Sequence, residues 1–301
     1  RMDSYRHHAD KDWQQKPIAK GHIRQQRIVT THILYITDIH MKSNKIRGII
    51  FDYGGTLDTR GDHWSEVIWD GYQQCGIAVD KTSYRDAYVY GERALAVNPI
   101  VTPDFPFIDL LREKLQLQLQ FLCGCPLLPT GKDDDQRQTQ LASHLQMTAD
   151  EISDTAMRIA TCINDATNAL LHENRKVLEC LRQAGLPMVL VSNFYGNIRT
   201  VLRDAHLDGF FKDIVESAVV GVRKPNPAIF ALGVCALDLP ASEVLVVGDT
   251  YGKDIVPAHQ LGCHTIWIKG RQWEDKPADE SICDDVITRL EDMLKFVSQN
   301  A

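Results

Sequence analysis

Four polar side chains that could do chemistry follow short apolar runs, or the glycine that ends one: Asp52, Ser192, Asn193 and Asp249. A carboxylate in such a position is a suitable nucleophile because carboxylates form aspartyl phosphates. Ser192 and Asn193 offer a hydroxyl and a free backbone N–H that could hold phosphate oxygens. Lys224 could neutralise charge on Asp52 and on a phosphate group. These residue types match the needs of phosphoryl transfer, so the sequence predicts a site of that kind.

A metal site is predicted beside the nucleophile. Asp249 and Asp254 would place two further carboxylates near Asp52. Three neighbouring carboxylates repel one another unless a cation binds, and hard oxygen ligands suit Mg²⁺. Gly54 and Gly55 let the backbone turn tightly and approach a ligand. We therefore expect Mg²⁺ as the cofactor.

The apolar runs before these residues indicate buried strands. We expect strands at 46–51, 188–191, 214–215, 244–247, 265–268 and 286–287. Helices are predicted over 175–184, 198–205, 227–236, 255–261 and 288–297. This alternation predicts an α/β fold with a Rossmann-like, doubly wound parallel sheet and right-handed crossovers. Ligands bind such sheets at the carboxyl ends of the strands, where we expect the polar residues to meet.

One connection in the chain is much longer than the others. Between Asp58 and about Leu171 no buried-strand pattern occurs. Helices are expected over 64–75, 83–96, 106–122, 135–146 and 149–171. Residues 80–83 and 148–151 have the composition of helix starts. We predict an all-helical cap domain, residues 61–171, inserted into a core domain of residues 45–60 and 172–301.

Residues 1–44 are polar and basic, and only residues 28–36 have strand character. We expect this segment to be a flexible extension. Met41 stands just before the first convincing strand. The change in composition there suggests that the working protein starts at Met41.

The composition narrows the classes of function. The 301 residues are 44% hydrophobic and 24% charged, as in soluble globular proteins, and the net charge is −7. An acidic balance argues against a nucleic-acid partner, and no apolar run reaches the roughly 18–20 residues of a membrane span. Without the apolar segment of a signal peptide, we expect a cytoplasmic protein. The eight cysteines are expected to be reduced, and the Cys123-Gly-Cys125 pair to be buried or half-buried thiols.

Four segments resemble, in order, the four motifs of the haloacid dehalogenase superfamily. They are Ile49-Ile-Phe-Asp52-Tyr-Gly-Gly-Thr56-Leu57, Val189-Leu-Val-Ser192-Asn193, Arg223-Lys224-Pro225-Asn226-Pro227-Ala-Ile-Phe230 and Val247-Gly248-Asp249-Thr-Tyr-Gly-Lys-Asp254-Ile255. The resemblance covers residues 46–59 and about 172–297. The long insertion just after the first motif is similar to that of the subclass with a helical cap.

The resemblance implies a role for each matching residue. Asp52 would attack phosphorus, assisted by Lys224 and Ser192. Mg²⁺ would be held by Asp52, Asp249 and the backbone carbonyl of Gly54, with Asp254 as a ligand or a supporting carboxylate. Phosphate would contact Gly55, Thr56 and Asn193. The cap would close over the site and exclude water. The substrate would be a small phosphorylated metabolite, and we allow for a homodimer.

The chain departs from the family pattern at one position. The phosphatases place a second Asp two residues after the nucleophile, and it handles the proton of the leaving group; here that residue is Gly54. Loss of such acid–base help typically costs ~10²- to 10⁴-fold in rate. Asp58, His63 or a cap side chain could supply the proton instead, although a loop or packing role is the commoner one for both. The substrate could instead have a good leaving group, such as an acyl phosphate or an anhydride.

Two further readings stay open. The protein could bind phosphate esters in a regulatory role without efficient turnover. It could also be a phosphonatase-type C–P hydrolase, which needs a cap lysine that forms a Schiff base; Lys81 and Lys114 are in the insert, but no local motif marks either. Haloacid dehalogenases work without the metal, so Asp249 and Asp254 argue against that activity.

Overall fold

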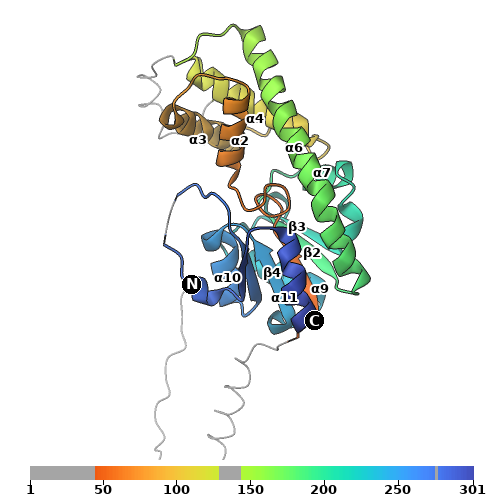
Figure 1. The fold of residues 1–301 in the computed structure, drawn as a ribbon. Coiled ribbons are helices and arrows are strands. Elements are labelled where there is room, and N and C mark those ends of the chain that lie inside the picture. The colour runs from red at the N-terminus through yellow and green to blue at the C-terminus, as the bar shows by residue number, and fades with distance from the viewer. Residues whose placement is uncertain (1–44, 129–143, 275–276) are drawn as a thin grey trace, which may run out of the picture. The chain divides into compact units, whose positions relative to one another are not determined.

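The computed structural model describes residues 45–128, 144–274 and 277–301 (Figure 1). The extension predicted over residues 1–44, with its strand-like run at 28–36 and Met41, lies outside the described residues. Most of the helix predicted over 135–146 also lies outside them, and its last three residues are not helical. None of the described helices is both long enough and apolar enough to cross a lipid bilayer.

Six parallel strands form one sheet in the order β3-β2-β1-β4-β5-β6. They are β1 (Gly48–Phe51), β2 (Met188–Ser192), β3 (Asp213–Glu216), β4 (Val244–Gly248), β5 (His264–Ile268) and β6 (Asp285–Ile287). All six predicted strands are confirmed. In the register of the sheet, Phe51 pairs with Leu190 on one side and Val247 on the other. The three central strands therefore end at the same edge, where the residues that follow them come together.

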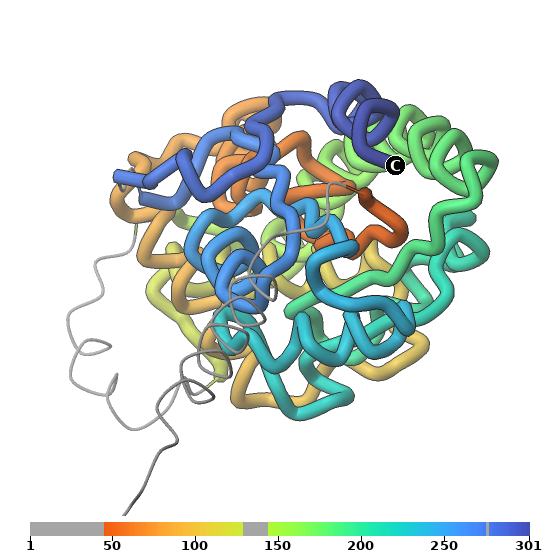
Figure 2. Tube along the Cα trace, turned by 90° about the horizontal axis from the view of Figure 1, so that it is seen from below, coloured from red at the N-terminus to blue at the C-terminus, as the bar shows by residue number. Residues whose placement is uncertain are grey.

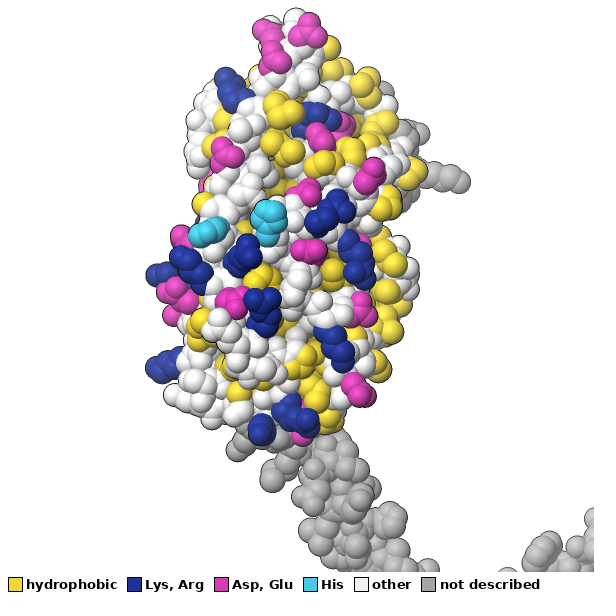
Figure 3. Space-filling view, turned by 90° about the vertical axis from the view of Figure 1, so that its right-hand side faces the viewer, with side chains coloured by type: hydrophobic (Ala, Val, Ile, Leu, Met, Phe, Trp, Pro, Cys, Tyr) yellow, Lys and Arg dark blue, Asp and Glu magenta, His cyan; other side chains and the backbone are white. Residues whose placement is uncertain are grey.

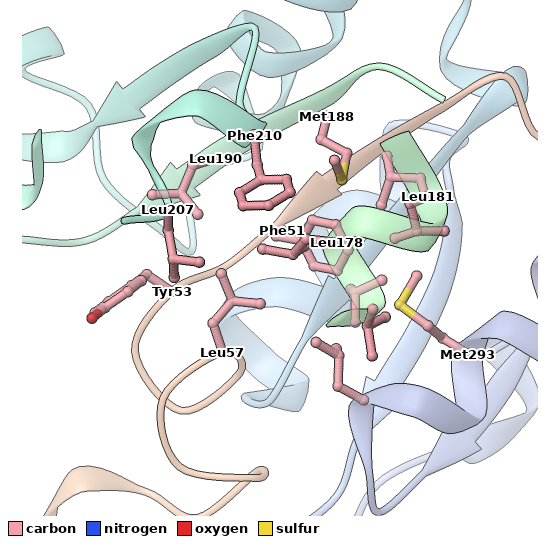
Figure 4. Close-up of a cluster of buried hydrophobic side chains, with 14 of the residues drawn as sticks. Phe51, Tyr53, Leu57, Leu178, Leu181, Met188, Leu190, Leu207, Phe210 and Met293 are labelled. Carbon is pink, nitrogen blue, oxygen red and sulfur yellow. The ribbon is translucent and has the colours of Figure 1, made fainter. Parts of the chain in front are cut away.

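The sheet is covered on both faces because successive residues of a strand point to opposite sides. Ile49 and Phe51 belong to the hydrophobic core on one face, and Ile50 belongs to the core on the other. Figure 4 shows Phe51 among side chains that include Leu178 and Met293. The first face packs against the C-terminal half of α6 (Ala149–Gln183), α7 (Ile198–Asp204) and α11 (Met293–Asn300), and the second against α9 (Ala228–Leu237) and α10 (Val256–Gln260). In Figure 2, α11 lies beside α6.

The described residues between β1 and β2 form helices and no strand; we call this segment, up to Leu171, the insert. Its helices are α2 (Trp64–Gln74), α3 (Lys81–Val97), α4 (Phe107–Leu122) and the N-terminal half of α6. The three complete helices start and end within two residues of their predicted bounds. The side chain of Asp80 accepts hydrogen bonds from the first turn of α3, and Thr148 and Glu151 form a reciprocal capping box on α6. The insert has a hydrophobic core of its own, which includes Tyr72 and Leu115.

Helix α6 corrects the prediction of two separate helices over 149–171 and 175–184. It is one helix of 35 residues, about 50 Å long at 1.5 Å per residue. Neither Gly nor Pro interrupts it, and apolar residues recur at helical spacing along its whole length. Ile159 packs in the core of the insert, whereas Leu178 packs against the sheet. The boundary predicted between residues 171 and 172 falls inside this helix.

Polar contacts tie the insert to the sheet domain. The guanidinium of Arg271, which follows β5, bonds to the carboxylates of Asp62 at 2.6 Å and Asp70 at 2.6 Å. On another side, the amide of Asn197 donates to the backbone carbonyl of Phe105 at 2.8 Å. These bonds join α2 and the loop before α4 to the strands that carry the predicted site.

Short elements complete the described chain. They are α8 (Ser217–Val220), 3₁₀ turns at Asp208–Phe210, Ala241–Glu243, Glu280–Ile282 and Leu290–Asp292, and a π-helical turn at Tyr251–Ile255. The helix predicted over 288–297 is therefore a 3₁₀ turn followed by α11. The helix predicted over 255–261 is α10, and the π-helical turn that precedes it takes in residue 255. Such turns are frequent at functional sites, and this one contains Asp254.

None of the eight cysteines forms a disulfide bond with another. Cys123 is half-buried as expected, but Cys125 is exposed, which corrects the prediction for this pair. The reason is local: Cys125 follows the end of α4, where the chain turns outward at Gly124 with a φ of 73°.

Candidate active site

Residues at the carboxyl ends of the central strands line one cavity between the sheet and the insert. Its volume is about 690 Å³. The predicted site residues along its wall are Asp52, Gly54, Ser192, Asn193, Lys224, Asp249 and Asp254. Asp52 is only 6% exposed. The carboxyl edge of the sheet, where these residues were predicted to meet, thus brings together side chains from Asp52 to Asp254, about two hundred residues apart in the chain.

Lys224 is bonded to two of the carboxylates. Its Nζ lies 2.6 Å from Oδ1 of Asp52 and 2.7 Å from Oδ1 of Asp254. The backbone at Lys224 is held by the side chain of Asn193, which accepts from its N–H at 2.9 Å and donates to its carbonyl at 3.1 Å. The Asn193 side chain therefore positions the lysine, a role that the sequence did not indicate.

The charges in this group do not balance. Burial raises the pKa of Asp52 to about 6, although Lys224 acts in the opposite direction. Burial and the nearby Asp254 and Asp52 raise the pKa of Asp249 well above its ordinary value. Burial alone would lower the pKa of Lys224, but the two carboxylates bonded to it raise it. One ammonium thus faces three carboxylates, which leaves excess negative charge in a buried place.

This arrangement fits a divalent cation. Ligand atoms of Asp52, Asp249 and Asp254 all lie within 4.8 Å of one another, and all three residues are buried. They are hard oxygen donors of the kind that Mg²⁺ prefers. A bound cation would offset both the burial of the Asp249 carboxylate and its repulsion by Asp254 and Asp52, which together raise its pKa. The donor set of the structure therefore suits the metal that was expected from the sequence.

Two glycines allow the carboxylates to approach the backbone. Gly55 has a φ of 99°, and a Cβ at this residue would overlap the carboxylate of Asp249. A Cβ at Gly248 would overlap the side chain of Asp254. Neither position can hold a larger side chain without displacing a site carboxylate.

Neighbouring polar groups orient Asp249 and Asp254. Thr250 donates from its hydroxyl to Oδ2 of Asp249 at 3.1 Å and from its backbone N–H to Oδ2 of Asp254 at 2.9 Å. The hydroxyl of Thr56 lies 3.5 Å from Oδ1 of Asp249, and the indole of Trp267 donates to the Asp249 carbonyl at 2.6 Å. Sequence reasoning missed Thr250 and Trp267. The position of Thr250, directly after a strand-end carboxylate, was the only available signal.

Asp58, one candidate for the missing proton donor, forms hydrogen bonds to the surrounding loop and to Trp64 instead. Its Oδ1 accepts from the backbone N–H of Gly55 at 2.7 Å and its Oδ2 from the indole N–H of Trp64 at 3.1 Å. The side chain is 2% exposed, and burial raises its pKa to about 8. Asp58 is not among the residues that line the cavity. Trp64 does line it, beside Gly54.

His63, the other named candidate, lines the cavity as the N-cap of α2. Its Nδ1 accepts from the backbone N–H of Ser65 at 3.2 Å. Burial, and next the charge of Lys253, lower the pKa of His63 to about 4. The imidazole is therefore neutral at pH 7, and with Nδ1 as acceptor its proton is on Nε2. It can donate a hydrogen bond to a ligand, but it does not carry an imidazolium proton to give away.

The chain matches known proteins over the segments that build this site. The family model described as haloacid dehalogenase-like hydrolase matches residues 46–262. A glyceraldehyde 3-phosphate phosphatase from Pyrococcus abyssi is 33% identical over 126 residues, which are 41% of this chain and 52% of that protein. A phosphoserine phosphatase from Thermus thermophilus is 31% identical over 103 residues, 34% of this chain and 41% of that protein. The chain thus spans about half the length of these relatives, or less.

Solved structures share the fold. The crystal structure of a dehalogenase with an intermediate complex superimposes with a TM-score of 0.50 at 17% identity, over 84% of this chain and 97% of that one. At this identity the likeness is one of architecture.

Proposed function

The chain belongs to the haloacid dehalogenase-like hydrolases, and we propose that it is a magnesium-dependent phosphatase acting on a small phosphate ester through a phosphorylated Asp52. The observation that carries the proposal is the buried group of Asp52, Asp249 and Asp254 with Lys224 bonded to two of them, at the wall of a cavity. The names of the relatives from Pyrococcus abyssi and Thermus thermophilus support a phosphatase-type activity.

Asp52, Asp249 and the backbone carbonyl of Gly54 would hold Mg²⁺. Both oxygens of Asp254 already accept hydrogen bonds, one from Lys224 and one from the backbone of Thr250. This carboxylate would therefore hold Lys224 in place rather than bind the metal directly. When bound, Mg²⁺ offsets negative charge on the nucleophile and on the phosphate together. The position of Gly55 requires a residue without a side chain, because a Cβ there would overlap the carboxylate of Asp249.

In the first step, an oxygen of Asp52 forms a bond to phosphorus and the ester P–O bond breaks. Its electron pair leaves with the alcohol oxygen, which then takes up a proton. Lys224, 2.6 Å from Oδ1 of Asp52 and 2.7 Å from Oδ1 of Asp254, favours the ionised nucleophile, and its third N–H group can bond to a phosphate oxygen. Ser192 offers its hydroxyl to the same group. In the second step water attacks the aspartyl phosphate, which releases inorganic phosphate and restores Asp52.

The source of the leaving-group proton limits the range of substrates. Gly54 has no side chain, Asp58 is bonded to Gly55 and Trp64 behind the cavity wall, and His63 is neutral. We therefore propose that the protein acts best on phosphate groups whose leaving oxygen needs little protonation, such as acyl phosphates or aryl esters. On the face of the molecule shown in Figure 3, basic and acidic side chains are interspersed.

The test is hydrolysis of acetyl phosphate and p-nitrophenyl phosphate with and without Mg²⁺, by the wild-type chain and by Asp52→Asn. We expect activity that requires Mg²⁺ and falls to background in the variant. An exposed carboxylate, Asp104, provides the control variant Asp104→Asn, which should behave as wild type. Activity that survives Asp52→Asn would overturn the nucleophile.

Gly54 also favours a second candidate, a regulatory protein that binds phosphate esters without turning them over. It predicts magnesium-dependent binding of phosphate esters with no release of inorganic phosphate from any substrate. The phosphonatase reading is less well supported. Lys81 pairs with Glu66 away from the cavity, and Lys114 lines the cavity but pairs with Glu92 at 2.7 Å. A Schiff base requires a neutral amine, which such an ion pair disfavours.

A further inference from the structure

The insert presents an ion pair to the cavity, away from the carboxylates of the sheet. Nζ of Lys114 on α4 lies 2.7 Å from Oε1 of Glu92 on α3. The hydroxyl of Tyr195, which follows β2, donates to Oε2 of Glu92 at 2.6 Å, and its ring lies 4.7 Å from the Lys114 ammonium. We call these three residues the Glu92 cluster. All of them line the cavity, and they join the insert to the sheet domain across it.

In the Glu92 cluster Lys114 is buried and Glu92 is half-buried, and several of their neighbours in the wall are apolar. The side chain of Lys114 is 9% exposed and that of Glu92 31%. Leu110, Leu111 and Phe107 line the same cavity. An ion pair in such surroundings contributes little to stability compared with apolar side chains of similar size, because both charges lose their hydration. Its presence here therefore calls for another explanation, and ligand recognition supplies one.

The bonding capacity of the cluster is not used up. Oε1 of Glu92 accepts no hydrogen bond in good geometry from any described residue, although the ammonium is close. The ammonium of Lys114 has three N–H groups, and within the described residues only the contact with Glu92 and the face of the Tyr195 ring engage it. The cluster therefore offers donors and an acceptor side by side.

The net charge of the Glu92–Lys114 ion pair determines which chemical group of a ligand it can bind. The carboxylate and the ammonium cancel, so the pair does not attract a second anion, and a zwitterion would have to separate them. Hydroxyl groups both donate and accept, so they can bond to Glu92 and Lys114 without disturbing the pair. The cationic lining residues Arg93, Arg223 and Lys253 are exposed, which places them at the mouth, where they would attract the phosphate ester from solution.

We propose that the Glu92 cluster recognises hydroxyl groups on the organic part of the substrate, so that the protein acts on polyhydroxylated phosphates such as sugar 1-phosphates, whose anomeric oxygen leaves more readily than the oxygen of an ordinary alcohol. This inference rests on the proposed function, because it concerns the same cavity. A volume of about 690 Å³ lies within the usual range for small-ligand sites. Aromatic rings of Tyr88 and Trp64 in the wall suit the apolar faces of a sugar ring.

The experiment compares kcat/KM for glucose 1-phosphate with kcat/KM for p-nitrophenyl phosphate, which carries no hydroxyl group. The variants are Glu92→Gln, Tyr195→Phe and the double variant Glu92→Gln/Lys114→Met, which leaves no unpaired charge. We expect the ratio of the two values to fall about 10- to 100-fold in Glu92→Gln and the double variant, chiefly through KM for the sugar phosphate. Tyr195→Phe should shift it less. The control Glu113→Gln, on α4 but outside the cavity lining, should leave the ratio unchanged.

Two outcomes would overturn the inference. One is an unchanged ratio in all three variants, which would mean that the cluster only supports the fold. The other is that the wild type prefers phosphoserine or phosphoglycolate to glucose 1-phosphate and that the variants abolish this preference. The cluster would then bind a zwitterion or a second anion rather than hydroxyl groups. If no substrate is hydrolysed, including p-nitrophenyl phosphate, the proposed function fails separately. Calorimetric binding of glucose 1-phosphate with Mg²⁺ then decides the inference: it should be weakened in Glu92→Gln, and equal or absent binding would exclude it.

Discussion

The indole Nε1 of Trp64 lies 3.5 Å from the position that a Cβ on residue 54 would occupy. This is an ordinary contact distance, and the backbone of Gly54 is not in the positive-φ region. The same N–H donates to Asp58, which in turn holds the backbone of Gly55. A side chain at residue 54 would thus lie beside the Trp64 indole at the cavity wall, without strain in the loop.

Gly54→Asp should therefore fold and should raise kcat on alkyl phosphates such as glycerol 3-phosphate. The new carboxyl group would protonate the leaving oxygen, and general acid catalysis typically contributes ~10²- to 10⁴-fold. Steady-state kinetics at several pH values would measure the gain. The control is Gly54→Asn, which has the same size and no proton to give. An equal rate in the Asp and Asn variants would mean that another group already transfers the proton.

The three clustered carboxylates lead to a prediction about the metal. Asp249→Asn should abolish stabilisation by Mg²⁺ while leaving the metal-free protein at least as stable as wild type. The reason is that Asp249 is a proposed ligand whose ionised form is disfavoured without a cation, since burial, and next the nearby Asp254 and Asp52, raise its pKa. Thermal unfolding with increasing Mg²⁺ would test this, since a ligand at 100 times its Kd stabilises by about 2.7 kcal/mol. A variant that keeps the full Mg²⁺ shift would exclude Asp249 as a ligand.

The contact between Gly55 and Asp249 leads to a prediction about the backbone. Gly55→Ala should lower the free energy of unfolding by about 1–3 kcal/mol, because φ at this residue is 99° and the Cβ would overlap the Asp249 carboxylate. It should also weaken Mg²⁺ binding. The matched control is Gly252→Ala, where nothing lies within 4 Å of the new Cβ. Urea denaturation of both variants would compare them, and equal stability would contradict the close approach.

The sheet and its functional edge could be predicted because the relevant signals are local. A buried parallel strand is an apolar run, and polar residues such as Asp52 and Asp249 stand out where it ends. The order of the strands then brings these ends together. Local signals also predicted the start of α3, since Asp80 caps the helix with its own side chain.

What could not be predicted depends on contacts between distant segments. Helix α6 continues past residue 171 because its partner changes from the insert to the sheet while its apolar spacing persists, and local composition does not indicate which partner a helix has. The Glu92 cluster joins α3, α4 and the segment after β2, so no spacing in the sequence relates its members. Asp58 was expected to be a loop residue, but the sequence did not indicate that its two oxygens accept hydrogen bonds from Gly55 and Trp64.

Two opposing effects act on the ionisation of Asp58. Hydrogen bonds from Gly55 and Trp64 to its two oxygens favour the carboxylate, whereas burial and the nearby Asp52 favour the neutral acid. Burial is the larger effect, and it raises the pKa from 3.8 to about 8. The folded protein therefore keeps a proton that the unfolded chain loses from about pH 4 upward.

The stability of the wild type should consequently fall, relative to Asp58→Asn, as the pH rises from about 4 to about 8. Across this range the unfolded chain ionises at residue 58 while the folded protein does not, and each pKa unit of difference corresponds to about 1.4 kcal/mol. Above pH 8 the folded form ionises too, and the difference should level off. Any cost of the amide beside the indole N–H is independent of pH, so the slope isolates the ionisation. Urea denaturation of both proteins from pH 4 to pH 9 measures it. A difference that grows in favour of the wild type with rising pH would show that the two hydrogen bonds outweigh burial and that Asp58 is ionised in the fold.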